Sequence, residues 1–447
     1  MNYYLKNAKI VNEGKVFEGS VLITNGKIER IFRLPLSPSP PASYTIIDLN
    51  GKYLLPGVID DQVHFRDPGL THKGDLFTES RAAVAGGVTS FMDMPNTIPN
   101  AVTLGILEDK FSLASEKSFA NFSFFMGGSN LHVKELLKVD PKNVCGIKLF
   151  LGSSTGNMLV DDPEVLKTIF AEAPGLIAAH CEDESTVKQN LALMYQKYGD
   201  DIPVQMHPEI RSEEACFTCS EKYVEMAEKY GSRFHVIHIS TAKELSLFRN
   251  DIPLAKKKIT NEVCVHHLWF NDSDYEKKGN QIKWNPAIKK ESDREALFNA
   301  VLNDTIDVIA TDHAPHTWEE KSQSYIKAPS GAPLVQHSLV AMLEFVSMGK
   351  ITLEKLVQKM SHDPAILFRI EKRGHIREGY WADLVVVDPE TSWTVSKENI
   401  LYKCKWSPLE GEIFHHKVLQ TFVNGDLVFD NGIFDEDFRG SRLKFKS

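Results

Sequence analysis

The middle of the chain, residues 53–370, alternates apolar runs with stretches of helical period, and this alternation restricts the fold more than any other feature. Candidate strands lie at 88–94, 146–150, 176–180, 234–239 and 307–312, and amphipathic stretches such as 162–173 and 293–302 lie between them. Strands that alternate with helices over this length form parallel sheets, most economically a closed (β/α)8 ring. The sequence therefore predicts an α/β protein built on a TIM-like barrel.

Both ends of the chain have the pattern of short strands instead. Strand-like runs lie at 5–11, 20–24 and 27–31, and again at 382–388 and 421–429. Asn-Gly pairs at 25–26 and 424–425 indicate tight hairpin turns. We expect a small β-sandwich made from both termini, with domain limits of 1–52 and 371–447 for its two parts and 53–370 for the barrel.

Charge and composition exclude several kinds of partner. The net charge of −9 does not favour nucleic acid or an anionic membrane. No apolar run reaches the roughly 18 residues of a membrane span, and the N-terminus lacks the pattern of a signal peptide. The six cysteines are scattered, as in proteins of a reducing compartment. We expect a cytoplasmic protein that acts on a small molecule, and the sequence leaves a homo-oligomer open.

Polar residues gather where the predicted barrel strands end. They are His64, Asn96, Lys148, His180, His238 and Asp312. The carboxyl ends of barrel strands converge on one face, so we expect these side chains to share one site. Each alone has an ordinary explanation, such as a hydrogen-bonded rim histidine or a lysine that reaches solvent. Together, imidazoles, a carboxylate and a lysine favour a metal-assisted hydrolytic site.

Lys148 is the unusual member of this set. An ammonium group cannot bind a metal, and burying it in an apolar strand is costly unless it is neutralised. A neutral lysine amine can react with CO₂ to form a carbamate, whose two oxygens can bridge two cations. The alternative is a lysine paired with a carboxylate in the barrel core.

An ordered series of short segments resembles the dihydroorotases of the amidohydrolase superfamily. The matching segments are 63–69, 94–97, 146–149, 179–182, 235–240, 284–286 and 312–317. Any one of them is a weak signal, but the series in this order is specific and spans most of the chain. The resemblance implies reversible hydrolysis of (S)-dihydroorotate to N-carbamoyl-L-aspartate, a step of de novo pyrimidine biosynthesis.

The resemblance also implies roles for individual residues. His64 and Asp312 would bind a first zinc ion, His180 and His238 a second, and a carboxylated Lys148 would bridge the two. Asp312 would also act as the general base and acid. The residues implied in substrate binding are Arg66, Asn96, Asn285, His316, Ser330 and Gly331. Three other histidines at family positions, 235, 266 and 267, are expected to be structural.

Arg66 is the residue that suggests which ring is opened. Its guanidinium can form a bidentate pair with the carboxylate of dihydroorotate. Allantoinases and hydantoinases resemble this chain in their metal ligands but lack the pairing of Arg66 with Asn96, and such a cyclic amidase is the alternative enzyme. A surface ion pair with Asp67 is the ordinary explanation for Arg66.

Gln62 is the departure from the family pattern. Dihydroorotases normally carry His-x-His where this chain has Gln62-Val63-His64. A carboxamide oxygen is a weaker zinc ligand than an imidazole nitrogen. We expect one tightly bound zinc and a labile second one, with catalysis retained. The other interpretation is an inactive dihydroorotase-like subunit of a carbamoyltransferase assembly.

Overall fold

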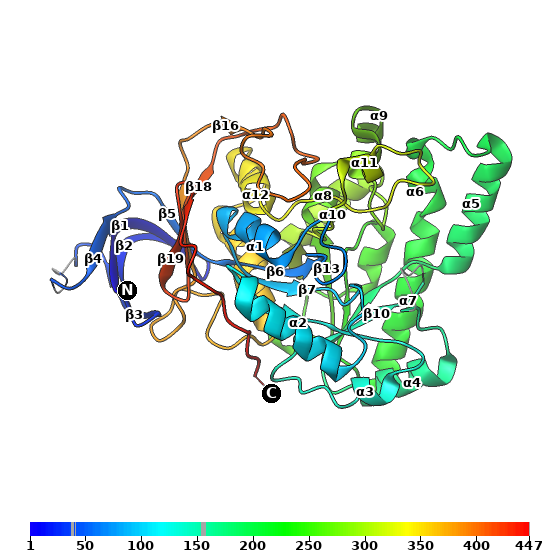
Figure 1. Cartoon of the computed structure of the whole chain (residues 1–447), viewed down its shortest axis with the longest axis horizontal. Helices are drawn as coiled ribbons and strands as arrows, with labels where there is room; N and C mark the ends of the chain where they lie inside the picture. Colours follow the sequence, from blue (N-terminus) through cyan, green and yellow to red (C-terminus); the bar gives the residue numbers. More distant parts are fainter. Residues whose placement is uncertain (37–39, 41, 153–157, 447) are drawn as a thin grey trace.

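A ring of parallel strands forms the centre of the molecule (Figure 1). The computed structural model describes residues 1–36, 40, 42–152 and 158–446. The strands of the ring are β6 (Val58–Val63), β7 (Val88–Asp93), β8 (Asn121–Phe124), β9 (Met126–Gly127), β10 (Ile147–Phe150), β11 (Ile177–His180), β12 (Phe234–Val236), β13 (Ile259–Cys264) and β14 (Val308–Ala310). β6, β7 and β8 pair in that order, and so do β9 to β14. Val63 pairs with His313, just beyond β14, and thereby closes the ring. The predicted α/β barrel is confirmed.

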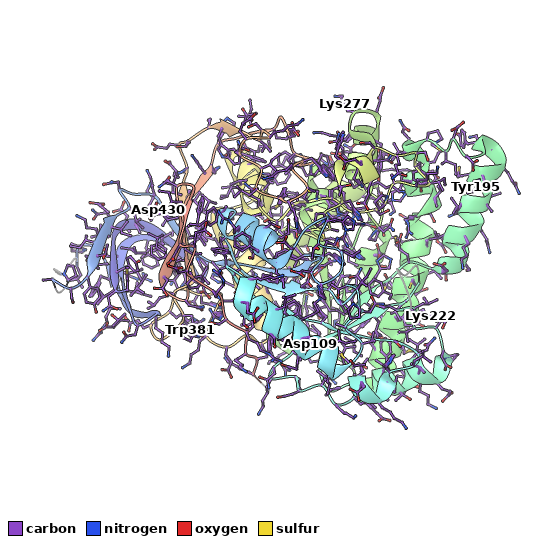
Figure 2. All side chains as sticks on the ribbon, in the orientation of Figure 1. Asp109, Tyr195, Lys222, Lys277, Trp381 and Asp430 are labelled. Atoms are coloured by element: carbon purple, nitrogen blue, oxygen red, sulfur yellow. The ribbon has the colours of Figure 1, made fainter. Side chains whose placement is uncertain are left out.

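Helices follow the barrel strands and cover the outside of the ring (Figure 1). They are α1 (Leu76–Ala85), α2 (Leu104–Lys117), α3 (Val133–Leu136), α4 (Pro163–Glu172), α5 (Glu184–Tyr198), α6 (His207–Ile210), α7 (Glu213–Tyr230), α8 (Val265–Trp269), α9 (Tyr275–Lys278), α10 (Glu291–Leu302), α11 (Trp318–Lys321), α12 (Ser338–Ser347), α13 (Leu353–Val357) and α14 (Asp363–Leu367). α5 and α7 carry Tyr195 and Lys222 on the outside of the molecule (Figure 2). In the described part of the chain, no helix is both long and apolar enough to cross a membrane.

The start of α4 illustrates how the sequence sets these boundaries. The Asp162 carboxylate accepts hydrogen bonds from the backbone N–H groups of Glu164 and Val165, which lack partners within the helix. Pro163 occupies the first turn, where its missing N–H costs nothing. The helix predicted for 162–173 therefore forms over almost that range.

Strands from both ends of the chain share one sheet. They are β1 (Tyr3–Asn12), β2 (Lys15–Thr24), β3 (Lys27–Arg33), β4 (Thr45–Asp48), β5 (Tyr53–Pro56), β15 (Leu384–Asp388), β18 (Lys417–Val423), β19 (Asp426–Asp430) and β20 (Ile433–Phe434). Their order is β20-β19-β18-β15-β5-β1-β2-β3, with β4 beside β1. β16 (Trp393–Thr394) and β17 (Ile413–Phe414) form a separate pair. The β5 strand, which follows residue 52, pairs with β1 and β15 in this sheet. The two-layer sandwich and the domain limits stay predictions.

The two Asn-Gly pairs form the expected hairpin turns. Asn25 and Gly26 have φ angles of 50° and 80°, and Asn424 and Gly425 have 53° and 82°. Two successive positive φ angles are the signature of a type I′ turn. The turns also touch, because a Cβ added to Gly425 would lie 2.5 Å from the Cα of Gly26. The N-terminal and C-terminal strands are therefore joined at their turns as well as in the sheet.

Two barrel strands end earlier than their apolar runs. The runs extend to residues 239 and 312, but β12 ends at Val236 and β14 at Ala310. The chain leaves the extended conformation at His238 and Asp312, whose φ angles are 43° and 47°. The hydrophobic pattern did not reveal that the chain leaves the extended conformation at these two residues. This change of direction brings the side chains of His238 and Asp312 to the rim of the barrel.

Candidate active site

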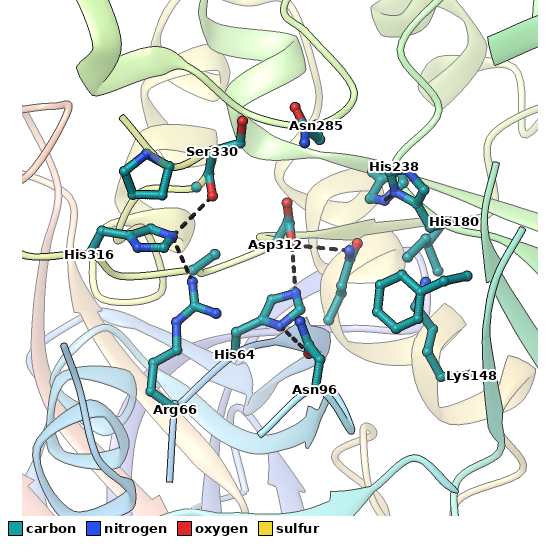
Figure 3. A pocket seen from close by; sticks show the side chains of 16 residues that line it. His64, Arg66, Asn96, Lys148, His180, His238, Asn285, Asp312, His316 and Ser330 are labelled. Atoms are coloured by element: carbon teal, nitrogen blue, oxygen red, sulfur yellow. Dashed lines mark hydrogen bonds and ion pairs between the residues drawn. The ribbon is translucent and has the colours of Figure 1, made fainter. Parts of the chain in front are cut away.

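A cavity of about 270 Å³ lies where the barrel strands end (Figure 3). Its lining consists of Gln62, His64, Arg66, Asn96, Lys148, Phe150, His180, Ile237, His238, Asn285, Asp312, Ala314, His316, Pro329, Ser330 and Gly331. Every residue that the sequence suggested for metal or substrate binding is in this set. The structure brings all of them together, although their individual roles stay predictions.

His64 and Asp312 form one pair in this cavity. The Nε2 atom of His64 lies 3.1 Å from Oδ1 of Asp312, and its Nδ1 atom lies 2.9 Å from Oδ1 of Asn96. The amide Nε2 of Gln62 donates to the same Asp312 oxygen at 3.1 Å. Its Oε1 accepts from the thiol of Cys264 at 3.5 Å. Gln62 thus presents an N–H group, rather than its oxygen, to the carboxylate.

His180 and His238 form a second pair. Nδ1 of His180 lies 3.0 Å from Nε2 of His238, and the two rings meet edge to face. Burial lowers the pKa of both imidazoles, which favours the neutral form. A neutral imidazole offers the nitrogen lone pair that a metal ion needs.

Lys148 lies on the same wall with its ammonium group fully buried. Burial lowers the pKa of Lys148 to about 7. Within the described residues its Nζ atom has no hydrogen-bond partner, and it lies 4.7 Å from the centre of the Phe150 ring. The carboxylate partner considered from the sequence is therefore not found in this part of the chain. A partly neutral amine without a partner fits carboxylation, and with the two pairs it completes a donor set suited to divalent cations.

Three residues of the site have left-handed backbone conformations that side-chain-bearing residues rarely adopt. The φ angles are 67° at Arg66, 43° at His238 and 47° at Asp312. Such conformations cost about 1–3 kcal/mol each and persist where the surroundings enforce them. The site is therefore built partly from strained backbone.

Buried carboxylates from strands hold the backbone at or next to each of these residues. The acceptors are Asp93 for the N–H of Phe65 at 2.7 Å, Glu262 for the N–H of His238 at 3.2 Å, and Asp60 for the N–H and hydroxyl of Thr311 at 3.3 and 2.6 Å. The motifs in the sequence did not point to these supporting residues. Of the three, Asp93 carried a signal in the sequence, as a carboxylate within the strand-like run 88–94, because buried acids need a dedicated partner.

Arg66 is buried beneath the cavity rather than exposed. Its Nε atom donates to the carbonyl of Pro315 at 3.0 Å, and Nη2 lies 3.1 Å from Nε2 of His316. Asp67 pairs instead with Lys117 at 2.9 Å. The alternative explanation for Arg66, a surface ion pair with Asp67, is therefore wrong. The guanidinium faces the cavity beside His316.

Gly331 leaves no room for a side chain. Its φ angle is 121°, and an added Cβ would lie 2.7 Å from the carbonyl oxygen of Ala314. We expect Gly331→Ala to lower the free energy of unfolding by about 1–3 kcal/mol, through strain and this clash. Thermal unfolding measures the change. Gly349→Ala is the control, because Gly349 also has positive φ but open space around its Cβ. Equal losses in both variants would show that the close approach to Ala314 is unimportant.

Two other groups of potential ligands lie close together within the described residues, and neither contains a predicted ligand. They are Asp61 with His235 and Glu262, and Cys264 with His266 and His267. His235 is held by Thr260 Oγ1 at 2.9 Å and Glu262 Oε2 at 3.1 Å. His266 stacks on Trp284 with ring centres 4.1 Å apart. His267 Nε2 lies 3.2 Å from the carbonyl oxygen of Pro286. These contacts support the structural role expected for the three histidines.

Comparison with known proteins identifies the family. The model of the Amidohydrolase family matches residues 53–428, most of the chain. The chain belongs to the amidohydrolase family. Full-length relatives of this amidohydrolase carry the name dihydroorotase. That of Methanosphaera stadtmanae is 31% identical over 441 residues, 98% of both chains. That of Carboxydothermus hydrogenoformans is 33% identical over 442 residues, 96% of this chain and 98% of the relative.

Solved structures of hydantoinases share the fold. The L-hydantoinase (dihydropyrimidinase) of Arthrobacter aurescens superimposes with a TM-score of 0.91 at 25% identity, over 97% of each chain. The dihydropyrimidinase of Brevibacillus agri gives 0.87 at 23% identity, over 97% of this chain and 96% of that one. The similarity to the Brevibacillus agri protein concerns the fold alone. Family membership implies a requirement for metal, and the donor set described above is compatible with it.

Proposed function

We propose that this amidohydrolase is a dihydroorotase, which hydrolyses the cyclic amide of (S)-dihydroorotate reversibly to N-carbamoyl-L-aspartate in de novo pyrimidine biosynthesis. The observation that carries the proposal is the placement of buried Arg66 beside His316, in the cavity that also holds the two ligand pairs. A guanidinium fixed there suits a substrate with a carboxylate next to the amide to be cleaved. The dihydroorotase relatives support the same activity.

Substrate binding follows from the polar groups on the walls of the cavity. Arg66 would pair with the substrate carboxylate, and Asn96 and His316 would complete its binding site. Asn285 would contact the ring from the opposite wall. Ser330 and Gly331 would contribute backbone groups, which the missing side chain of Gly331 allows to approach closely.

Metal binding would use both ligand pairs. We assign His64 and Asp312 to a first zinc ion, His180 and His238 to a second, and a carboxylated Lys148 to the bridge between them. When bound, zinc supplies Lewis-acid polarisation of the amide carbonyl and lowers the pKa of water. Asp312 takes the proton from the attacking water and gives it to the ring nitrogen as the C–N bond breaks. The Gln62 N–H group orients the Asp312 carboxylate for this transfer.

Gln62→His should increase the tightly held zinc from one equivalent to two. An imidazole is a better ligand than the carboxamide, whose oxygen faces Cys264 rather than Asp312. Metal content after exhaustive dialysis measures the effect. Gln62→Leu, which cannot bind metal, should retain one equivalent. Two tightly held equivalents in the unchanged protein would contradict our assignment of a weak first site.

A hydantoin-type cyclic amidase is the second candidate, and the high structural similarity to the L-hydantoinase favours it. Hydrolysis assays with dihydroorotate, allantoin and a hydantoin, each with the metal content measured, separate the two activities. We expect turnover of dihydroorotate alone. Failure on all three substrates by metal-loaded protein would favour the inactive subunit of a carbamoyltransferase assembly. The cytoplasmic location and a homo-oligomer stay predictions.

A further inference from the structure

Two lysines near the cavity are buried in an unusual setting. Lys283 is 7% exposed and Lys321 is 2% exposed. Within the described residues, neither forms an ion pair with a carboxylate. Burial lowers the pKa of both, that of Lys283 to about 7, and the neighbouring charge of Lys283 lowers that of Lys321 further. Burying two cations side by side is unfavourable, so the groups that accept their hydrogen bonds are the key to why both lysines are buried here.

Among the described residues, both ammonium groups donate only to backbone carbonyls, and most of these belong to one loop. Lys283 Nζ donates to the carbonyls of Tyr325 and Ala328, each at 2.6 Å. Lys321 Nζ donates to the carbonyl of Pro329 at 2.9 Å and to that of Lys283 at 3.3 Å. The two side chains thereby satisfy three carbonyl groups, at residues 325, 328 and 329, in a stretch that lies outside the helices and strands.

The loop formed by residues 323–331 is also joined directly to the segment 280–285. The N–H of Gly331 donates to the carbonyl of Lys283 at 2.8 Å. The amide of Asn280 donates to the carbonyl of Gln323 at 2.8 Å. Both segments reach the cavity, through Asn285 on one side and Ser330 with Gly331 on the other. Figure 3 shows Asn285 and Ser330 on neighbouring walls.

We propose that Lys283 and Lys321 are positioning residues that hold the 323–331 loop in its substrate-binding conformation before the substrate arrives. This inference rests on the proposed function, because it assigns the loop to substrate recognition. The hydrogen bonds of the two lysines go to backbone carbonyls, so the lysines act through the backbone of Tyr325, Ala328 and Pro329. A loop that is already ordered loses less conformational entropy on binding, which strengthens affinity without changing the chemical step.

The test removes each ammonium group and keeps the length of the side chain. We expect Lys283→Met and Lys321→Met to raise the KM for dihydroorotate about 10- to 100-fold, which corresponds to the loss of one or two hydrogen bonds, and to change kcat little. Amide hydrogen exchange should accelerate within 323–331 and stay unchanged in the barrel strands. Lys321→Arg, which keeps charged donors, should restore part of the affinity.

Lys327→Met is the matched control, because Lys327 lies on the same loop with an exposed side chain. It should leave the exchange and KM as in the unchanged protein. If the two buried-lysine variants behave like this control, the proposal is wrong. If Lys283→Met does not fold, Lys283→Gln keeps a donor and should show intermediate exchange in 323–331; unchanged exchange would overturn the proposal. If the unchanged protein does not hydrolyse dihydroorotate, the proposed function fails, while the exchange experiment still decides whether the lysines hold the loop.

Discussion

Replacing Arg66 with alanine is expected to reduce kcat/KM for dihydroorotate by about three orders of magnitude, or about 4 kcal/mol. The guanidinium is buried, and its position is set by the carbonyl of Pro315 and by His316. Truncating it leaves the substrate carboxylate in a desolvated cavity without a counter-charge. Steady-state kinetics on purified, metal-loaded protein measures the loss.

Two controls separate recognition from general damage to the site. The metal content should stay the same in Arg66→Ala, since Arg66 contacts neither ligand pair. Arg66→Lys keeps the charge but not the bidentate geometry and should recover only part of the activity. An Arg66→Ala protein that opens dihydroorotate normally would refute the proposed substrate.

Replacing Lys148 with methionine should abolish metal binding at the bridged site and reduce kcat by more than about 10³-fold. The same change should leave the metal-free protein as stable as before, or more stable by about 1–2 kcal/mol. The reason is that the buried ammonium group has no hydrogen-bond partner in the described part of the chain, so its removal relieves a desolvation cost. Metal analysis, kinetics and denaturant unfolding of the apo protein measure the three effects.

Lys110→Met is the matched control for this prediction. Lys110 is also a fully buried lysine, but its Nζ atom pairs with the Asp93 carboxylate at 2.7 Å. Removing one partner of such a pair destabilises a protein by about 3–5 kcal/mol, because the other charge stays buried. A loss of stability in Lys148→Met as large as in Lys110→Met would show that Lys148 is a structural lysine and would contradict the carbamate.

Strand and helix periods were sufficient to predict the barrel and a β-rich domain built from both termini. The periodicity of 53–370 left few other packings for its apolar faces, and Asn25-Gly26 specified its turn through backbone sterics. Strand-end chemistry pointed to His64, Asn96, Lys148, His180, His238 and Asp312, because polar side chains at strand ends must meet at one face of a barrel. The family resemblance added the remaining substrate residues, Arg66, Asn285, His316, Ser330 and Gly331. The geometry of Gln62 was not accessible in this way, since the direction of its amide depends on Cys264 and Asp312, far away in the chain.

The sequence by itself determined the fold class, the family resemblance and the metal and substrate residues that meet in the cavity, because periodicity and short motifs are local properties. Only the tertiary structure decided how those residues are held. The strained φ angles of His238 and Asp312, the carboxylates beneath them, and the two buried lysines behind the 323–331 loop all depend on contacts between distant segments. The cost of a buried charge or a strained backbone is balanced by partners from elsewhere in the fold, so no local pattern could reveal it.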